Sequence, residues 1–144
     1  MQAGDQDVIA IGPLQIRYLL DGAARGTAGM FELTVPPGAK SPPAHSHANE
    51  EIIYGLEGVM RCEVGGEVRE VGPGDVSYTS SGVVHAFGNP YDRPARVVVV
   101  NTPDIGAQYF RDVAEAAGGP GGPNPAKIIE VMGRYGLIPA PPAP

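Results

Sequence analysis

The sequence predicts an all-β domain, an antiparallel sandwich or barrel, followed by two short helices. Short apolar stretches recur between residues 14 and 104, with turn residues roughly every six to twelve positions, a spacing typical of antiparallel sandwiches and barrels. Glycine (21) and proline (16) together supply about a quarter of the 144 residues, and both are used mainly in turns. This length fits one domain.

The expected strands are short apolar or alternating stretches that lie between turn residues. They cover residues 14–20, 29–35, 51–56, 59–64, 67–71, 76–79, 84–87 and 96–101. The turns are marked by Asp21-Gly22, Pro36-Pro37-Gly38, Glu57-Gly58, Gly65-Gly66 and Pro73-Gly74. We expect residues 1–13 to form a weakly ordered lead-in that ends at Gly12-Pro13, before the first strand.

Two helices are expected after the barrel. Residues 106–117 carry apolar side chains near helical spacing. After a Gly/Pro linker at 118–122, Asn124 is a good N-cap and Pro125 suits the first helical position. The second helix has one apolar stripe, made by Ile128, Ile129, Met132 and Tyr135. Gly136 is expected to end it.

The chain is therefore divided into a lead-in over residues 1–13, a barrel over 14–104 and a helical extension over 105–144, whose residues 139–144 are expected to fray. The net charge is −6, and no run of Lys or Arg is present, which argues against nucleic acid and anionic membranes as partners. The one cysteine, Cys62, fits a reducing compartment. Since the N-terminus lacks a secretion-signal pattern, we expect a cytoplasmic protein.

All three histidines of the chain suit one metal site. On a strand, residues two apart share a face with Cα atoms about 6.5–7 Å apart, so His45 and His47 can bind the same ion. Glu51 shares their parity, whereas the alternative carboxylate, Glu50, has the opposite parity. His85 belongs to a later strand, and a barrel would bring it across to the pair.

Two glycine-framed segments resemble the paired motifs of the cupin superfamily. They read Gly38-x6-His45-x-His47-x3-Glu51-x6-Gly58 and Gly74-x5-Ser80-x-Gly82-x2-His85-x3-Asn89. Ser80 stands where the family usually has proline, at a turn position that binds no metal. The resemblance implies a single cupin barrel, the jelly-roll or double-stranded β-helix.

The resemblance also implies the ligands of one divalent transition metal ion per chain, which are His45, His47, Glu51 and His85. Such a ligand set suits Fe, Mn, Ni, Co, Cu or Zn. The C-terminal stretch, with Tyr109-Phe110-Arg111 and Arg134-Tyr135-Gly136-Leu137, looks like the tail of small bacterial single-domain cupins labelled quercetin-dioxygenase-like.

Four residues are candidates for the substrate pocket. Phe87 shares parity with His85, Met60 and Cys62 lie one hairpin arm from Glu51, and Phe31 is a further candidate. The alternative is that these side chains fill the core of the barrel.

Ile52, Tyr54 and Leu56 fall on the face opposite Glu51, outside the barrel. Such an apolar strip predicts a homodimer, unless the helical tail covers it and leaves a monomer.

The sequence favours an enzyme that acts on a small aromatic, phenolic or 1,3-dicarbonyl compound. The first hypothesis is a metal-dependent dioxygenase in which Glu51 is both a ligand and the proton acceptor for a substrate hydroxyl. The second is a non-oxidative isomerase or polyketide cyclase that uses the ion as a Lewis acid. The third is a small-molecule-binding module without catalysis.

Overall fold

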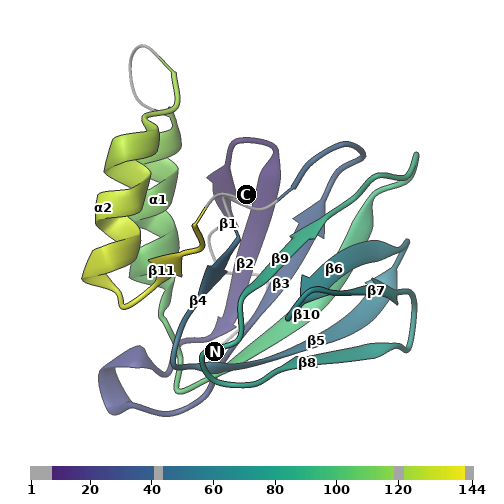
Figure 1. Cartoon of the computed structure of the whole chain (residues 1–144), viewed down its shortest axis with the longest axis horizontal. Coiled ribbons are helices and arrows are strands. Elements are labelled where there is room, and N and C mark those ends of the chain that lie inside the picture. Colours follow the sequence, from purple (N-terminus) through teal and green to yellow (C-terminus); the bar gives the residue numbers. More distant parts are fainter. Residues whose placement is uncertain (1–7, 41–43, 119–121, 142–144) are drawn as a thin grey trace.

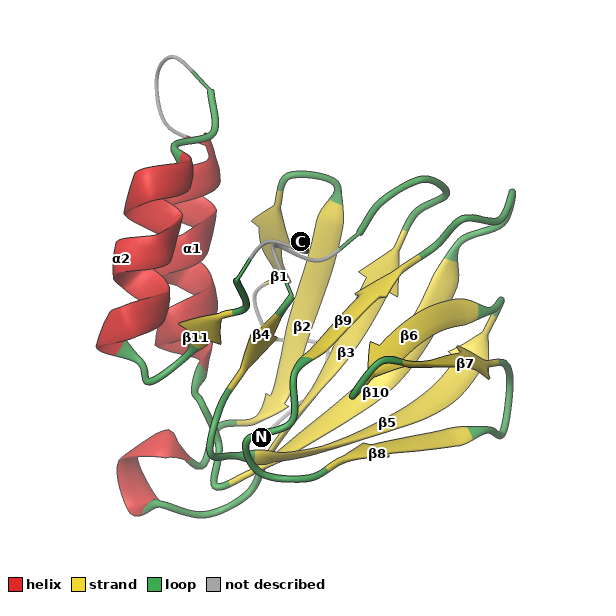
Figure 2. Ribbon diagram, viewed as in Figure 1, coloured by secondary structure: helices red, strands yellow, loops and turns green. Residues whose placement is uncertain are grey.

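The computed structural model describes residues 8–40, 44–118 and 122–141. Two antiparallel sheets face each other, and a pair of helices packs beside them (Figures 1 and 2). This arrangement confirms the all-β jelly-roll class with two C-terminal helices. In the described part of the chain, no helix has the length and apolar character needed to cross a membrane.

The larger sheet has six strands in the order β1-β2-β3-β10-β5-β8. Their bounds are β1 (Val8–Ile11), β2 (Leu14–Leu20), β3 (Gly29–Val35), β10 (Ala95–Thr102), β5 (Glu50–Glu57) and β8 (Val76–Thr79). Buried residues alternate with more exposed ones along β3 and β10, because successive strand residues point to opposite faces. The buried face lies against the smaller sheet and forms most of the core.

The smaller sheet has five strands in the order β11-β4-β9-β6-β7. Their bounds are β11 (Ile138–Pro139), β4 (His45–Ser46), β9 (His85–Gly88), β6 (Met60–Val64) and β7 (Glu67–Val71). The β6–β7 hairpin turns on Gly65 and Gly66, with φ values of +58° and +83°. Positive φ at both central residues is what a two-residue hairpin turn requires, and glycine adopts it without steric cost.

The helices α1 (Ala107–Gly118) and α2 (Pro125–Arg134) form a hairpin beside β1 (Figure 2). Asn124 caps α2, because its side chain accepts a hydrogen bond from the backbone N–H of Lys127. Between the helices lies a second apolar cluster, made by Tyr109, Val113, Val131, Met132 and Leu137. Phe110 joins this cluster to the main core, so the helical extension is packed onto the barrel.

Three strands of the structure lie outside the expected ranges: the short β4 at the histidine pair, β1 and β11. Val8–Ile11 pairs with β2 through the tight turn at Gly12-Pro13, where a weakly ordered lead-in was expected. Ile138–Pro139 pairs with β4, although fraying was expected from Pro139 onward. The pairing is possible because a proline is tolerated on an edge strand. Of the expected lead-in, linker and frayed end, residues 1–7, 119–121 and 142–144 lie outside the described residues.

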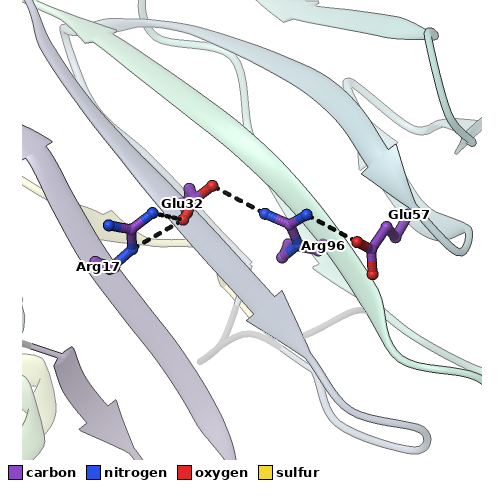
Figure 3. A network of polar contacts seen from close by, with 4 residues as sticks. All are labelled: Arg17, Glu32, Glu57 and Arg96. Atoms are coloured by element: carbon purple, nitrogen blue, oxygen red, sulfur yellow. Dashed lines mark hydrogen bonds and ion pairs between the residues drawn. The ribbon is translucent and has the colours of Figure 1, made fainter. Parts of the chain in front are cut away.

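The outer face of the larger sheet carries a charged network across β2, β3, β10 and β5 (Figure 3). Arg96 bridges two carboxylates, with its Nη1 2.9 Å from Glu32 Oε2 and its Nη2 2.8 Å from Glu57 Oε1. Arg17 Nε donates to Glu32 Oε1 at 3.0 Å. Solvent-accessible pairs of this kind add little stability, so the network mainly identifies this part of the face as polar.

The same outer face is apolar towards β5 and β8. We call Ile52, Tyr54, Val76 and Tyr78 the outer apolar strip, and their exposed fractions are 37%, 45%, 62% and 45%. Leu56, which was expected to extend the strip, is only partly exposed. The described helices lie beside β1 at the other edge of this sheet, so they leave the strip uncovered (Figure 1).

Candidate metal centre

Three histidines converge between the two sheets. His45 lies on β4, His47 follows that strand directly, and His85 begins β9. The β4–β9 pairing sets His45 opposite His85, although the two residues are forty positions apart in the sequence. One potential ligand atom from each of the three residues lies within 4.8 Å of the others. The fold therefore gathers three imidazoles at one point.

Backbone carbonyls orient two of these rings. His47 Nδ1 lies 2.9 Å from the Asn49 carbonyl oxygen, and His85 Nδ1 lies 2.9 Å from that of Val83. A carbonyl can only accept, so each Nδ1 carries a proton, and in a neutral ring the lone pair is then on Nε2. Metal-bound histidines are usually held in this way.

The buried Nε2 of His85 shows whether these residues fit a metal ion. Its Nε2 has no hydrogen-bond partner among the described residues, and buried nitrogens in native proteins are nearly always satisfied. A divalent ion would accept this lone pair together with those of His45 and His47. The donor set, three imidazoles and a nearby carboxylate, fits a transition metal.

Burial keeps His47 in the form that a metal requires. Its side chain is 3% exposed. Loss of hydration, followed by the nearby His85 charge, lowers the pKa of His47 from 6.5 to about 4. The imidazole is therefore neutral at pH 7, and a neutral imidazole can coordinate without first losing a proton.

The two neighbouring glutamates lie on opposite faces of β5. Glu51 points inward, and its Oε2 lies 3.5 Å from His85 Nε2, although it is not part of the tight three-histidine group. Burial raises the pKa of Glu51. Glu50 points outward, where its carboxylate accepts a hydrogen bond from the Tyr78 hydroxyl. The strand alternation thus brings Glu51, and not Glu50, to the histidines.

A narrow, mostly apolar cavity of about 70 Å³ adjoins the site. His45, His47 and Glu51 form part of its wall, with Phe31 and Phe87 among the apolar residues. Met60 and Cys62, the other two pocket candidates, are instead buried in the core, at 0% and 1% exposure. They sit on the inner face of β6, where the two sheets pack against each other.

Sequence reasoning missed two parts of this wall. The helical extension supplies Tyr109, Phe110 and Val113, whose helical spacing indicated a packing face but not what it would pack against. Asn101 on β10 also lines the cavity. The sequence did contain a signal for it. Asn101 follows Val97 and Val99 at every second position of the strand, so a polar side chain falls on the inward face.

Solved structures of known proteins resemble this fold. An RmlC-like cupin from Shewanella frigidimarina is 18% identical, with 72% of this chain and 89% of that chain covered and a TM-score of 0.63. The polyketide cyclase RemF from Streptomyces resistomycificus is 27% identical, with 72% and 78% covered and a TM-score of 0.61. A sugar phosphate isomerase from Silicibacter pomeroyi is 24% identical, with 72% and 75% covered and a TM-score of 0.60.

No curated protein matches the sequence. The family model described as "Cupin domain" matches residues 31–101, which include both glycine-framed segments from His45 to Asn89 and the strands that carry them. Together with the two facing sheets and the converging histidines, this match gives the identity of the fold: the chain belongs to the cupin superfamily.

Proposed function

We propose that the protein is a metal-dependent enzyme that acts on a small oxygen-bearing molecule, with dioxygenase-type chemistry as the first candidate. The observation that carries the proposal is the group of three converging imidazoles beside Glu51, with a buried and unsatisfied Nε2 on His85. His45, His47, His85 and Glu51 would hold the ion. When bound, it supplies Lewis acidity and, if redox-active, electron exchange with dioxygen.

The chain's own contribution to the reaction is proton transfer and the exclusion of water. Burial raises the pKa of Glu51, so this carboxylate is a stronger base than an exposed glutamate and can accept the proton of a substrate hydroxyl. Phe31 and Phe87 give the cavity an apolar wall. Such a wall favours an apolar gas such as dioxygen and the carbon part of the substrate over water.

A non-oxidative cyclase or isomerase is the second candidate. The likeness to the polyketide cyclase RemF, at 27% identity, favours it. In that reaction Glu51 would move a proton within the substrate while no oxygen is consumed. The same residues serve both candidates, so the reaction type has to be measured.

Metal analysis and oxygen uptake test the proposal in sequence. Protein purified without added metal should hold about one ion per chain. Oxygen consumption with phenolic and 1,3-dicarbonyl compounds would support the dioxygenase, whereas substrate turnover without oxygen consumption would support the cyclase or isomerase. Metal binding without turnover of any compound would point to a binding module.

A matched pair of variants checks that the ion occupies this site. His47→Ala should abolish stoichiometric metal, because it removes a buried ligand nitrogen. Glu50→Ala should retain it, because that carboxylate faces outward and contacts Tyr78. If Glu50→Ala lost the metal and His47→Ala kept it, the ligand set proposed here would be wrong.

A further inference from the structure

Asn101, on the inner face of β10, is a buried amide that no described residue satisfies. Its side chain is 1% exposed. Neither Nδ2 nor Oδ1 has a hydrogen-bond partner among the described residues. A carboxamide carries two N–H donors and a carbonyl acceptor, and leaving these groups unpaired in the interior is costly. The amide is therefore suited to a partner that is not part of the chain.

The strand register places this amide beside the candidate metal centre. Asn101 is paired with Glu51 of β5, and residues directly opposite each other in an antiparallel pair have Cβ atoms about 4.5–5.5 Å apart. On its other side Asn101 is paired with Gly29 of β3, which has no side chain to offer. The same cavity wall contains Asn101, His45 and His47. The amide thus faces the space in which a metal-bound molecule would lie.

The charges around the cavity restrict what this partner can be. In the described part of the chain, no lysine or arginine lines the cavity, and the one carboxylate in its wall is Glu51. A phosphate or a dicarboxylate would enter without a compensating cation from the protein, which is unfavourable in an apolar interior. Because the volume is about 70 Å³, the enclosed part of the molecule is small.

We propose that Asn101 binds the polar end of the substrate, and that this substrate is an uncharged molecule with a hydroxyl or N–H donor next to a carbonyl oxygen. The amide carbonyl would accept from that donor, while an amide N–H would donate to that oxygen. The carbon part of the molecule would pack on Phe31 and Phe87. This inference rests on the proposed function, since the metal holds the other side of the same molecule.

The test compares Asn101→Leu with the wild-type protein, both loaded with zinc. Leucine branches at the same carbon as asparagine but forms no hydrogen bond. The probe is acetohydroxamic acid, which is uncharged in solution near pH 7 and carries a carbonyl, an N–H and a hydroxyl on neighbouring atoms. Chelation by zinc removes the hydroxyl proton and leaves the N–H donor and the carbonyl oxygen for the amide. Its dissociation constant is measured by isothermal titration calorimetry, together with zinc content and melting temperature without the probe. Asn101→Ala replaces Asn101→Leu if the leucine variant does not fold.

Thr79→Val is the matched control. Thr79 is paired with Glu51 from the opposite side, on β8, is buried to the same degree as Asn101 and does not line the cavity. We expect Asn101→Leu to weaken probe binding at least tenfold, whereas Thr79→Val should change it less than twofold. Zinc content should stay near one ion per chain. The melting temperature of Asn101→Leu should be equal to or above that of the wild type, because an unsatisfied amide has been removed.

Three results would overturn the inference while leaving the metal site in place. They are equal probe binding by Asn101→Leu and wild type, no probe binding by zinc-loaded wild type, and a lower melting temperature of an Asn101→Leu protein that folds, which would indicate a structural amide. Loss of zinc from Asn101→Leu would also overturn it and make the amide a metal ligand. A wild-type protein that holds no zinc would refute the proposed function itself, and this inference with it.

Discussion

The stability of the metal-free protein should depend on pH through His47, and the dependence follows from its burial. The side chain is 3% exposed, and its Nδ1 is held by the carbonyl of Asn49. Burial first, and then the neighbouring His85 charge, lower the pKa of His47 from 6.5 to about 4 in the folded protein. The unfolded chain has no such environment, so its imidazole titrates near 6.5.

The direction of the pH dependence follows from which state, folded or unfolded, binds the proton at the higher pH. Between pH 6.5 and about 4 the unfolded chain is protonated at His47 while the folded protein is not, so acid favours unfolding. The contribution of His47 is complete above pH 6.5, falls as the pH drops and is lost below about 4. One pKa unit corresponds to 1.36 kcal/mol, so protonation of His47 over this pH range lowers the free energy of unfolding by about 3 kcal/mol. That is a large part of the stability of a small domain.

Urea unfolding of chelator-treated protein at several pH values between 7.5 and 4 measures the effect. The control is His47→Gln, which keeps a polar side chain at this position but cannot be protonated. Burial raises the pKa of Glu51, so acid stabilises the folded protein through this residue, which is opposite to the effect of His47. This contribution to the stability is largely common to both proteins. The wild type should lose about 3 kcal/mol more than the variant on acidification. Parallel stability curves for the two proteins would refute this reasoning.

Three further predictions concern the metal, the pocket and the assembly. Zinc at 100 times its dissociation constant should stabilise the wild type by about 2.7 kcal/mol and leave His47→Ala unchanged, as measured by thermal unfolding. Phe87→Ala should weaken binding of an aromatic ligand more than it lowers the melting temperature, because Phe87 lines the cavity and is only partly buried; an equal loss of both would indicate a core role. The outer apolar strip, which includes Ile52 and Tyr54, should pair two chains, so light scattering should give about twice 14.9 kDa. A mass near 15 kDa would contradict the dimer.

The sequence predicted best those features that depend on local patterns. Strands β2, β3, β7 and β8 have the bounds expected from alternation and flanking turn residues, because glycine and proline stop strands for local steric reasons. The spacing of His45 and His47 likewise needs no knowledge of the fold. The resemblance to cupins supplied the remaining step, since the meeting of His45 with His85 depends on the β4–β9 pairing, which no local pattern specifies.

The features that escaped prediction depend on contacts between distant parts of the chain. Pro139 indicated a frayed end by composition, yet Ile138–Pro139 pairs with β4 at an edge of the sheet. Met60 and Cys62 have the inward parity of pocket residues, but parity does not distinguish the cavity from the packed core beside it. The contribution of α1 to the cavity wall could not be predicted either, because an amphipathic pattern shows that a helix packs and not where.

The buried polar groups of this protein differ in how they are satisfied, and the difference indicates where a ligand binds. Asn89 is 2% exposed, but its amide donates to the carbonyls of Val35 and Arg93 and accepts from the N–H of Tyr91. Asp104, also buried, accepts from the Tyr18 hydroxyl and the Gly22 N–H.

In the described part of the chain, the buried side-chain nitrogens and oxygens without a partner belong to two residues, His85 and Asn101. Glu51 is a neighbour of both, with its Oε2 3.5 Å from His85 Nε2 and its backbone paired with Asn101. Unsatisfied groups scattered through a core would indicate poor packing. Here both are neighbours of one carboxylate, beside a cavity whose wall is otherwise mostly apolar. This concentration favours one binding site in which a metal ion satisfies His85 and the bound molecule satisfies Asn101.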